Sequence, residues 1–348
     1  MISPRPAVLK MAPYHPPSGG RAGKLRLDFN ENTVGCSPKV AEYLREVLTQ
    51  PLLAVYPEYE ETRPALAQFF GVNPDELLLS NGTDEAIQVL VNTYVDDGDE
   101  VLVLTPSYAM YRFYAELAGA QVREIAYEPD TLAFPVETFL ASILPRTRAI
   151  LIANPNNPTG CGIGLDVVER ILAAAPNAAV LIDEAYYEFC GRTALPLLGK
   201  YRNLLVSRTF SKAYGMAAMR MGCLISNAEN MAHLRKAQSP YSVNVLAALA
   251  ARVAVTDTEY VNGFVAEAVA SRETLYQFFD EMGIGYWRSE ANFVLFKAGA
   301  RAVPIRDELR RRGVLVRDRS YELPGAVRVT VGLAEQTERF MRELREIW

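Results

Sequence analysis

The sequence NLLVSRTFSKAYGMAAMRMG, residues 203–222, begins with an apolar run and continues into a segment in which Lys212 is flanked by small and hydroxyl residues and Arg220 follows eight positions later. The apolar run predicts a buried β-strand. Lys212 therefore lies just past the end of a strand, where a cation is usually a solvated surface residue. The lysine indicates a function only if other chemically active residues also follow the predicted strands.

Composition narrows the kind of protein. With 348 residues, half of them hydrophobic, the chain is long enough for about two globular domains. The net charge of −5 disfavours a general binder of nucleic acid or of anionic membranes. No segment reaches the roughly 20 apolar residues that span a membrane, and the N-terminus lacks a signal-peptide pattern. We expect a cytoplasmic protein that binds neither nucleic acid nor membrane.

Cysteine and histidine residues are few and scattered. The four cysteines lie far apart without a Cys-x-x-Cys pair, which favours free thiols in a reducing compartment over disulfides or a zinc site. The chain has two histidines, His15 and His233, and His15 lies in a proline-rich segment. A Ser-His-Asp hydrolase and a histidine-rich metal centre are therefore disfavoured, and we predict no metal site.

Short apolar runs alternate with helical patterns through most of the chain. Six runs predict strands: DELLLSNG, EVLVLTP, QVREIAY, TRAILIANP, AAVLIDEAY and NLLVSRTF. This alternation predicts an α/β fold in which a mainly parallel sheet, here of seven strands, lies between helices. From about Ser239, two long helical stretches precede shorter strands, which predicts a smaller α+β domain. The predicted division is an arm over residues 1–27, a large cofactor-binding domain over 28–240 and a small domain over 241–348.

Ligands of parallel α/β folds bind at the carboxyl ends of the strands, and unusual residues follow four of these ends. Gly82, Thr83 and Asp84 open a helix whose free N–H groups can bind a phosphate, although the same sequence is also an ordinary helix cap. In NPNNPTG, residues 154–160, a turn rich in proline and asparagine presents Asn157, whose amide can donate to a ligand oxygen. Each of these motifs is ambiguous by itself.

The other two strand ends carry charge. Asp183 follows the run AAVLI, where a buried carboxylate requires either an arginine in a structural ion pair or the protonated nitrogen of a pyridine ring. Lys212 can form a Schiff base, and Thr209, Ser211 and Arg220 can bind a phosphate through two hydroxyls and a guanidinium. A lysine for an aldehyde, an acid for a ring nitrogen, an amide for a ring oxygen and an anion site together match pyridoxal 5′-phosphate.

The chain also resembles a known family, the fold-type I pyridoxal-phosphate aminotransferases, and within it the histidinol-phosphate aminotransferase group. The motifs that carry the resemblance run nearly end to end: LDFNEN, VYPEY, NGTDEAI, PSYAMY, NPNNPTG, DEAYYEF, RTFSKAYGMAAMRMG, SEANFVLF, VLVRD and VRVTVG. The resemblance implies a homodimer with shared active sites. It also implies amino-group transfer to or from histidinol phosphate in histidine biosynthesis, with glutamate and 2-oxoglutarate as the amino-group partners.

The resemblance implies a role for each site residue. Lys212 is the Schiff-base lysine and the proton shuttle, and Asp183 pairs with the pyridinium nitrogen. Asn157 and Tyr186 bind the ring oxygen, Asn157 also contacts the substrate, and Tyr108 stacks on the ring. The cofactor phosphate is held by the helix start, by the residues around the lysine and by a tyrosine of the neighbouring subunit: Gly82, Thr83, Asp84, Thr209, Ser211, Arg220 and Tyr56. For Tyr111, core packing remains open.

Substrate binding is assigned by resemblance to the C-terminal strands and the arm. Arg328 clamps a carboxylate of glutamate or a phosphate of the second substrate, and Tyr14 lies near the substrate phosphate. Arg317 is a second cation, although an ion pair with Asp318 or Glu322 explains it nearly as well.

Several residues depart from those usual in the group, and two alternative activities stay open. Leu333, Ser242 and the segment GMAAMR replace more common choices. They leave room for an aminotransferase acting on phenylalanine or tyrosine. A decarboxylase of amino-acid phosphates is the other alternative, because it uses the same cofactor apparatus. A pyridoxal-binding regulator is disfavoured by the acidic net charge.

Overall fold

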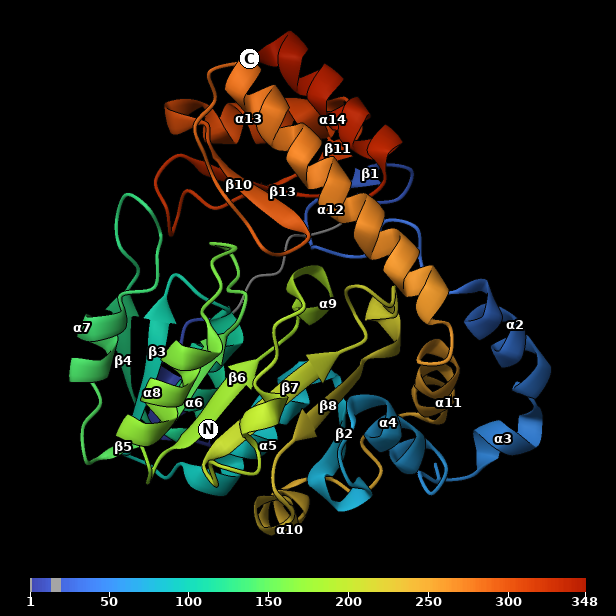
Figure 1. Ribbon diagram of the computed structural model, residues 1–348, viewed down its shortest axis with the longest axis vertical. Coiled ribbons are helices and arrows are strands. Elements are labelled where there is room, and N and C mark those ends of the chain that lie inside the picture. Colours follow the sequence, from blue (N-terminus) through green and yellow to red (C-terminus); the bar gives the residue numbers. More distant parts are fainter. Residues whose placement is uncertain (1, 14–19) are drawn as a thin grey trace.

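The computed structural model describes residues 2–13 and 20–348, so the predicted substrate residue Tyr14 lies outside the described residues. Within them, one sheet has seven strands, another has four, and two further short strands pair with each other. Figure 1 shows the seven-stranded sheet in the lower part of the molecule and the four-stranded sheet, with its helices, above it. The fold is α/β, as the sequence predicts.

Strands and helices alternate along most of the chain. The strands are β1 (Leu25–Arg26), β2 (Leu77–Asn81), β3 (Glu100–Thr105), β4 (Gln121–Ala126), β5 (Thr147–Ala153), β6 (Ala179–Asp183), β7 (Leu204–Thr209), β8 (Met221–Ile225), β9 (Tyr286–Trp287), β10 (Phe293–Lys297), β11 (Val314–Leu315), β12 (Arg317–Asp318) and β13 (Ala326–Thr330). The α-helices are α1 (Pro6–Lys10), α2 (Pro38–Val47), α3 (Gln50–Ala54), α4 (Thr62–Phe70), α5 (Gly82–Tyr94), α6 (Ala109–Ala118), α7 (Val136–Ala141), α8 (Leu165–Ala174), α9 (Tyr187–Cys190), α10 (Ala228–Ala237), α11 (Val245–Ala254), α12 (Thr258–Glu281), α13 (Ala302–Arg311) and α14 (Ala334–Ile347).

The large sheet has the strand order β2-β8-β7-β6-β5-β3-β4, and every strand except β8 runs in the same direction. Six strands form where the apolar runs predict them. The sequence pattern does not locate the seventh, β8. Residues 210–220 join β7 to β8 without an α-helix, so the chain returns beside β7 in the opposite direction. The start of β8 therefore lies at the same sheet edge as the carboxyl ends of the other strands.

Alternate residues of the large sheet face two apolar layers. Leu79 and Val206 face a layer that includes residues of α4, α7, α8 and α11. Leu78 and Leu205 face a second layer with α5, α6 and α10. Because both faces are covered, the strands read as continuous apolar runs. Polar side chains that need a ligand are therefore concentrated at the strand ends.

The small sheet is antiparallel, with the order β12-β13-β10-β9. Val294 and Val327 face a core that they share with α12, α13 and α14. Phe293 and Leu295 alternate with them and belong to the same layer as the large sheet. One face of the small sheet therefore packs on its own helices, and the other faces the large sheet.

The predicted domain boundaries stay a prediction, but two segments make contacts across them. In the predicted arm, β1 pairs in parallel with β11, and Leu27 lies in the core of the small sheet. In the predicted small domain, α11 packs on α2 and α4. Among the residues that the structure describes, no helix is long and apolar enough to cross a membrane.

Candidate active site

A cavity of about 180 Å³ lies where the strands of the large sheet end. Phe29 and Glu31 of the N-terminal segment contribute to its wall. Ten of the twelve residues predicted to bind the cofactor line it: Thr83, Asp84, Tyr108, Asn157, Asp183, Tyr186, Thr209, Ser211, Lys212 and Arg220. The eleventh, Gly82, directly precedes Thr83. The twelfth, Tyr56, lies elsewhere: it is 75% exposed and its ring stacks on Tyr241 with centroids 4.6 Å apart.

Asp183, the last residue of β6, has a buried carboxylate. The Tyr111 hydroxyl donates to Oδ2 at 2.7 Å, and the Ser207 hydroxyl donates to Oδ1 at 2.8 Å. Burial raises the pKa of Asp183, although both hydrogen bonds act against the rise. No cationic side chain among residues 2–13 and 20–348 forms an ion pair with it. Arg208 of the neighbouring strand β7 pairs instead with the adjacent Glu184 at 2.8 Å. The structural ion pair considered for Asp183 is therefore wrong.

Tyr111 belongs to the candidate site, although the sequence reasoning assigned it no role. Its ring packs in the apolar layer of α6, as core packing requires, but its hydroxyl binds the one carboxylate that faces the cavity from β6. The motif PSYAMY contains Tyr111, so the signal was available. Helical periodicity explains why the ring is buried, but it cannot identify the group that the hydroxyl binds.

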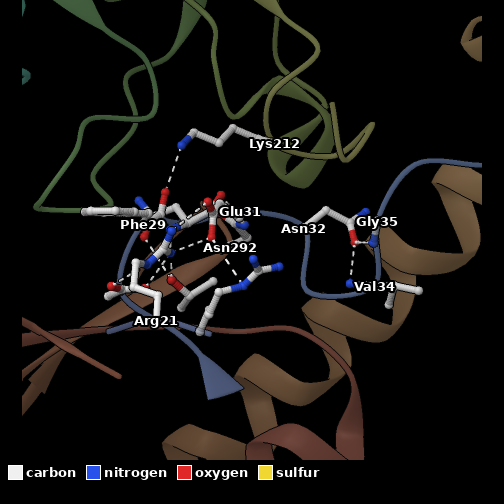
Figure 2. Close-up of polar contacts among 12 residues, drawn as sticks. Arg21, Phe29, Glu31, Asn32, Val34, Gly35, Lys212 and Asn292 are labelled. Carbon is white, nitrogen blue, oxygen red and sulfur yellow. Dashed lines mark hydrogen bonds and ion pairs between the residues drawn. The ribbon is translucent and has the colours of Figure 1, made fainter. Parts of the chain in front are cut away.

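Lys212 extends its amine to the N-terminal segment. Nζ donates to the carbonyl oxygen of Phe29 at 2.9 Å, as Figure 2 shows. Burial, and then the positive charge of Arg328, lowers the pKa of Lys212 from 10.5 to about 8. Near neutral pH a larger share of this amine is therefore uncharged than in an ordinary lysine, which favours both bond formation with a carbonyl carbon and proton abstraction.

The N-terminal segment supplies contacts that the sequence analysis does not assign. Arg21 pairs with Asp28 at 2.8 Å. It also pairs with Glu31 at 2.6 Å, as Figure 2 shows. The Arg21 guanidinium also lies 4.2 Å from the centre of the Phe29 ring. These contacts fix the backbone carbonyl that accepts from Lys212. The motif LDFNEN marked this segment, although the residue pattern alone assigned it no role.

Asn30 connects the same segment to Tyr186. Asn30 has a left-handed φ of 57°, which is uncommon for a residue other than glycine. Its Nδ2 donates to the Tyr186 hydroxyl at 2.9 Å. Because that oxygen accepts from Asn30, the proton of Tyr186 remains available to a ligand in the cavity.

A candidate anion site, hereafter the anion site, lies at the start of α5. Arg220, with φ 57°, directly precedes β8, and its Nη2 donates to Asp84 Oδ2 at 3.1 Å. The Tyr108 hydroxyl donates to Asp84 Oδ1 at 2.6 Å. The Asp84 side chain therefore orients Arg220 and Tyr108, and only its backbone N–H can bind an anion. The first N–H groups of α5 have no partner within the helix, so they and the guanidinium suit a phosphate.

Arg328, on β13, contacts a residue of the cavity wall from behind it. Its Nη1 donates to Asn157 Oδ1 and its Nη2 donates to the carbonyl of Asp28 at 2.7 Å. Since Asn157 accepts through its oxygen, its amide N–H groups remain free to donate to a ligand. Burial and neighbouring arginines lower the pKa of Arg328 to about 10, and Arg317 lies directly opposite it on β12.

Arg317 has neither of the ion pairs considered for it from the sequence. Asp318 lies 3.6 Å from Arg306, and Glu322 pairs with Arg319. The Arg317 guanidinium lies 6.0 Å from the ring of Phe29. Among the described residues it thus retains donors for an anion.

The family model for aminotransferase class I and II matches residues 22–344. The chain belongs to this family. The aminotransferase is 38% identical to the histidinol-phosphate aminotransferase of Symbiobacterium thermophilum, over 99% of this chain and 98% of that protein. It is 35% identical to histidinol-phosphate aminotransferase 2 of Methylococcus capsulatus, over 98% of this chain and 97% of that protein.

Solved structures agree with the fold of this aminotransferase. The histidinol-phosphate aminotransferase of Sinorhizobium meliloti, in complex with pyridoxal-5′-phosphate, matches with a TM-score of 0.87 at 23% identity, over 99% of this chain and 98% of that one. A mutant aspartate aminotransferase of Thermus thermophilus matches with a TM-score of 0.84 at 24% identity, over the full length of both. At these identities the likeness shows the fold.

Class I and II aminotransferases depend on pyridoxal phosphate, and the cavity of this one fits that group. Asp183 is a buried carboxylate without a cation among the described residues, as a pyridinium nitrogen requires. Lys212 presents an amine of lowered pKa to the same cavity. At the anion site there is no room for a side chain on Gly222, because a Cβ there would lie 2.8 Å from the backbone of Gly82.

Gly82 gives a test of the anion site. Its φ is +73°, and an added Cβ would lie 2.5 Å from Nη2 of Arg220. We expect Gly82→Ala to displace Arg220 and to weaken pyridoxal-phosphate binding at least about tenfold, since a charged hydrogen bond contributes about 1.5–3 kcal/mol. Fluorescence titration of the cofactor-free protein measures the affinity.

Gly71→Ala is the matched control for that variant. Gly71 has a similar φ of +69°, but nothing lies within 4 Å of its added Cβ. Both variants are expected to lose about 1–2 kcal/mol of unfolding free energy from backbone strain. Equal cofactor affinity in the two variants would show that Arg220 does not bind the cofactor phosphate.

Proposed function

We propose that this aminotransferase transfers the amino group between histidinol phosphate and 2-oxoglutarate, with glutamate as the other amino-group partner, in histidine biosynthesis. The observation that carries the proposal is that Lys212, Asp183 and the anion site share one cavity, with Arg328 hydrogen-bonded to Asn157 in its wall. The names of relatives at 35–38% identity over nearly the whole chain support the choice of substrate.

Pyridoxal phosphate, when bound, carries the amino group and withdraws electrons from the carbon that loses a proton. Asp183 would hold the positive charge of the ring nitrogen, and Asn157 and Tyr186 would donate to the ring oxygen. Tyr108 would supply an aromatic face. The anion site would take the cofactor phosphate through the α5 N–H groups, Thr209, Ser211 and Arg220.

Lys212 would act first as the attachment point of the cofactor and then as the general base. When it is not bonded to the cofactor, Nζ would lie close to the carbon that must lose its proton, so one residue would serve both roles. Its lowered pKa suits the second role, because an uncharged amine can accept that proton.

Arg328 and Arg317 would bind the anionic end of each substrate. The carboxylate of glutamate needs one guanidinium, whereas a phosphate ester has more acceptor oxygens and more charge. Two arginines facing each other across β12 and β13 suit the ester. Tyr14, outside the described residues, stays a predicted partner of the substrate phosphate.

We also propose a homodimer in which Tyr56 of each subunit reaches the partner's cofactor phosphate. The support is an exposed apolar surface around Tyr56 and Tyr241, which also includes Leu53 and Val55 at 60% and 63% exposed. A monomeric mass in analytical ultracentrifugation would contradict it. A cytoplasmic location is supported by four free cysteines and is tested by cell fractionation.

The substrate is tested by assaying glutamate formation from 2-oxoglutarate. We expect kcat/KM for histidinol phosphate to exceed that for phenylalanine by about 100-fold, because phenylalanine lacks the ester that two arginines would bind. Preference for phenylalanine would favour the aromatic aminotransferase. Release of carbon dioxide without glutamate would favour the decarboxylase.

A further inference from the structure

One face of the small sheet carries three arginines. Arg317 of β12 lies opposite Arg328 of β13 in antiparallel register. Arg319 follows two residues after Arg317, and its N–H donates to the carbonyl of Ala326 at 2.9 Å, so the pairing of the two strands continues to this residue. Because side chains alternate along a strand, Arg317, Arg319 and Arg328 share one face.

This face is turned toward the active site. The Arg328 guanidinium binds Asn157 in the cavity wall and lies 5.3 Å from the ring of Phe293, which belongs to the layer of the large sheet. Asp318, between the two arginines of β12, points the other way and pairs with Arg306 of α13. Because side chains alternate between the two faces of a strand, the three arginines lie on the face opposite the core of the small sheet.

Arg319 is buried, and its hydrogen-bonding capacity is only partly used. Its side chain is 10% exposed, Nη2 donates to Glu322, and Nε has no hydrogen-bond partner among the described residues. Nε of Arg328 also lacks a partner there. After burial, the charge of Arg319 is the next cause of the lowered pKa of Arg328, so the two guanidiniums are close. Buried donors of like charge without partners indicate a site for an anion.

We propose that Arg319 is a third anion-binding residue of this site, which makes it selective for a phosphate ester over a carboxylate, and that Glu322 holds Arg319 until the ester binds. The proposal rests on the proposed function, since it concerns the same substrate site. Three guanidiniums and the Glu322 carboxylate give a net charge of about +2, which complements the charge of a phosphate monoester, about −1.5 to −2 at neutral pH. The single negative charge of a carboxylate is already balanced by Arg328 alone.

The test measures binding of inorganic phosphate to the cofactor-loaded enzyme by calorimetry. The phosphate of the loaded cofactor would occupy the anion site of α5, so the titration would report on other sites. We expect Arg319→Gln to weaken phosphate binding at least about tenfold, the loss of one charged hydrogen bond, and Arg319→Lys to restore part of it. The KM for glutamate should change less than about threefold, because its carboxylate does not need Arg319.

Two further variants keep the test decisive. Glu322→Gln removes the carboxylate that competes for Arg319, so we expect tighter phosphate binding, by about threefold or more. Arg306→Gln is the matched control: it removes an arginine that contacts the opposite face of β12 and should leave phosphate binding unchanged. This pair of variants gives a result even if Arg319→Gln does not fold.

Each outcome either supports or overturns the proposal. No detectable phosphate binding to the loaded wild type, or equal affinity in wild type and Arg319→Gln, overturns it. Weaker binding in Arg319→Gln together with tighter binding in Glu322→Gln supports it. If histidinol phosphate is not turned over but phosphate binding still depends on Arg319, only the proposed function falls. If it is turned over and Arg319→Gln binds phosphate normally, only this inference falls.

Discussion

The Lys212→Ala variant is expected to lose amino-group transfer by at least about 10³-fold, because one change removes both the attachment point of the cofactor and the general base. Among the residues that the structure describes, Lys212 is the one lysine in the lining of the cavity, and its amine has a lowered pKa there. The measurement is a single turnover with glutamate, followed through the visible absorption of the cofactor. The same spectrum shows whether the variant still holds pyridoxal phosphate through the anion site alone.

Lys200→Ala is the control for the loss of a lysine. Lys200 is exposed and pairs with Glu169 on the surface, so its removal should change the rate by less than about twofold. A Lys212→Ala variant that retains wild-type turnover, with its folding verified by circular dichroism, would remove the basis of the proposed function. The buried lysine after β7 would then have no role in the reaction.

The positions of six strands along the chain and the sheet edge that carries the site follow from the sequence because both depend on local patterns. Continuous apolar runs predict strands that are buried on both faces, and polar motifs at their ends predict a binding edge. The position of strand β8 cannot be predicted in this way, since it depends on a reversal of the chain between residues 210 and 220. That reversal brings Arg220 to the same edge as Asp183 and Lys212.

Contacts between distant segments could not be read from the sequence. Asn30 meets Tyr186 across 156 positions, and the carbonyl of Phe29 meets Lys212 across 183. Charge complementarity alone was also misleading. It allowed an arginine partner for Asp183, whereas the buried Arg208 of β7 pairs with Glu184, the carboxylate of the next residue. Which of two adjacent carboxylates faces the cavity depends on the strand alternation and on the packing around it.

Asp183→Asn is the second change with a large expected effect. The amide keeps the shape of the side chain but carries no charge, so it cannot stabilise a protonated ring nitrogen. We expect the rate of the half-reaction with glutamate to fall by at least about 10²-fold, the scale seen when a fixed electrostatic contact at a reacting centre is removed. Rapid-mixing spectroscopy of the loaded variant measures that rate. Asp166→Asn, an exposed change of the same charge on α8, should leave it within about twofold.

The same variant should fold at least as stably as the wild type when the cofactor is absent. Burial raises the pKa of Asp183, so the folded cofactor-free protein binds this proton more tightly than the unfolded chain does. The contribution of Asp183 to stability is therefore present below the ordinary pKa of 3.8 and is lost as pH rises through the raised value. Urea unfolding of the cofactor-free proteins across the acid range should show this decline in the wild type and not in Asp183→Asn. A variant that is inactive and also much less stable at neutral pH would mean that Asp183 serves the fold, through Tyr111 and Ser207, rather than the cofactor.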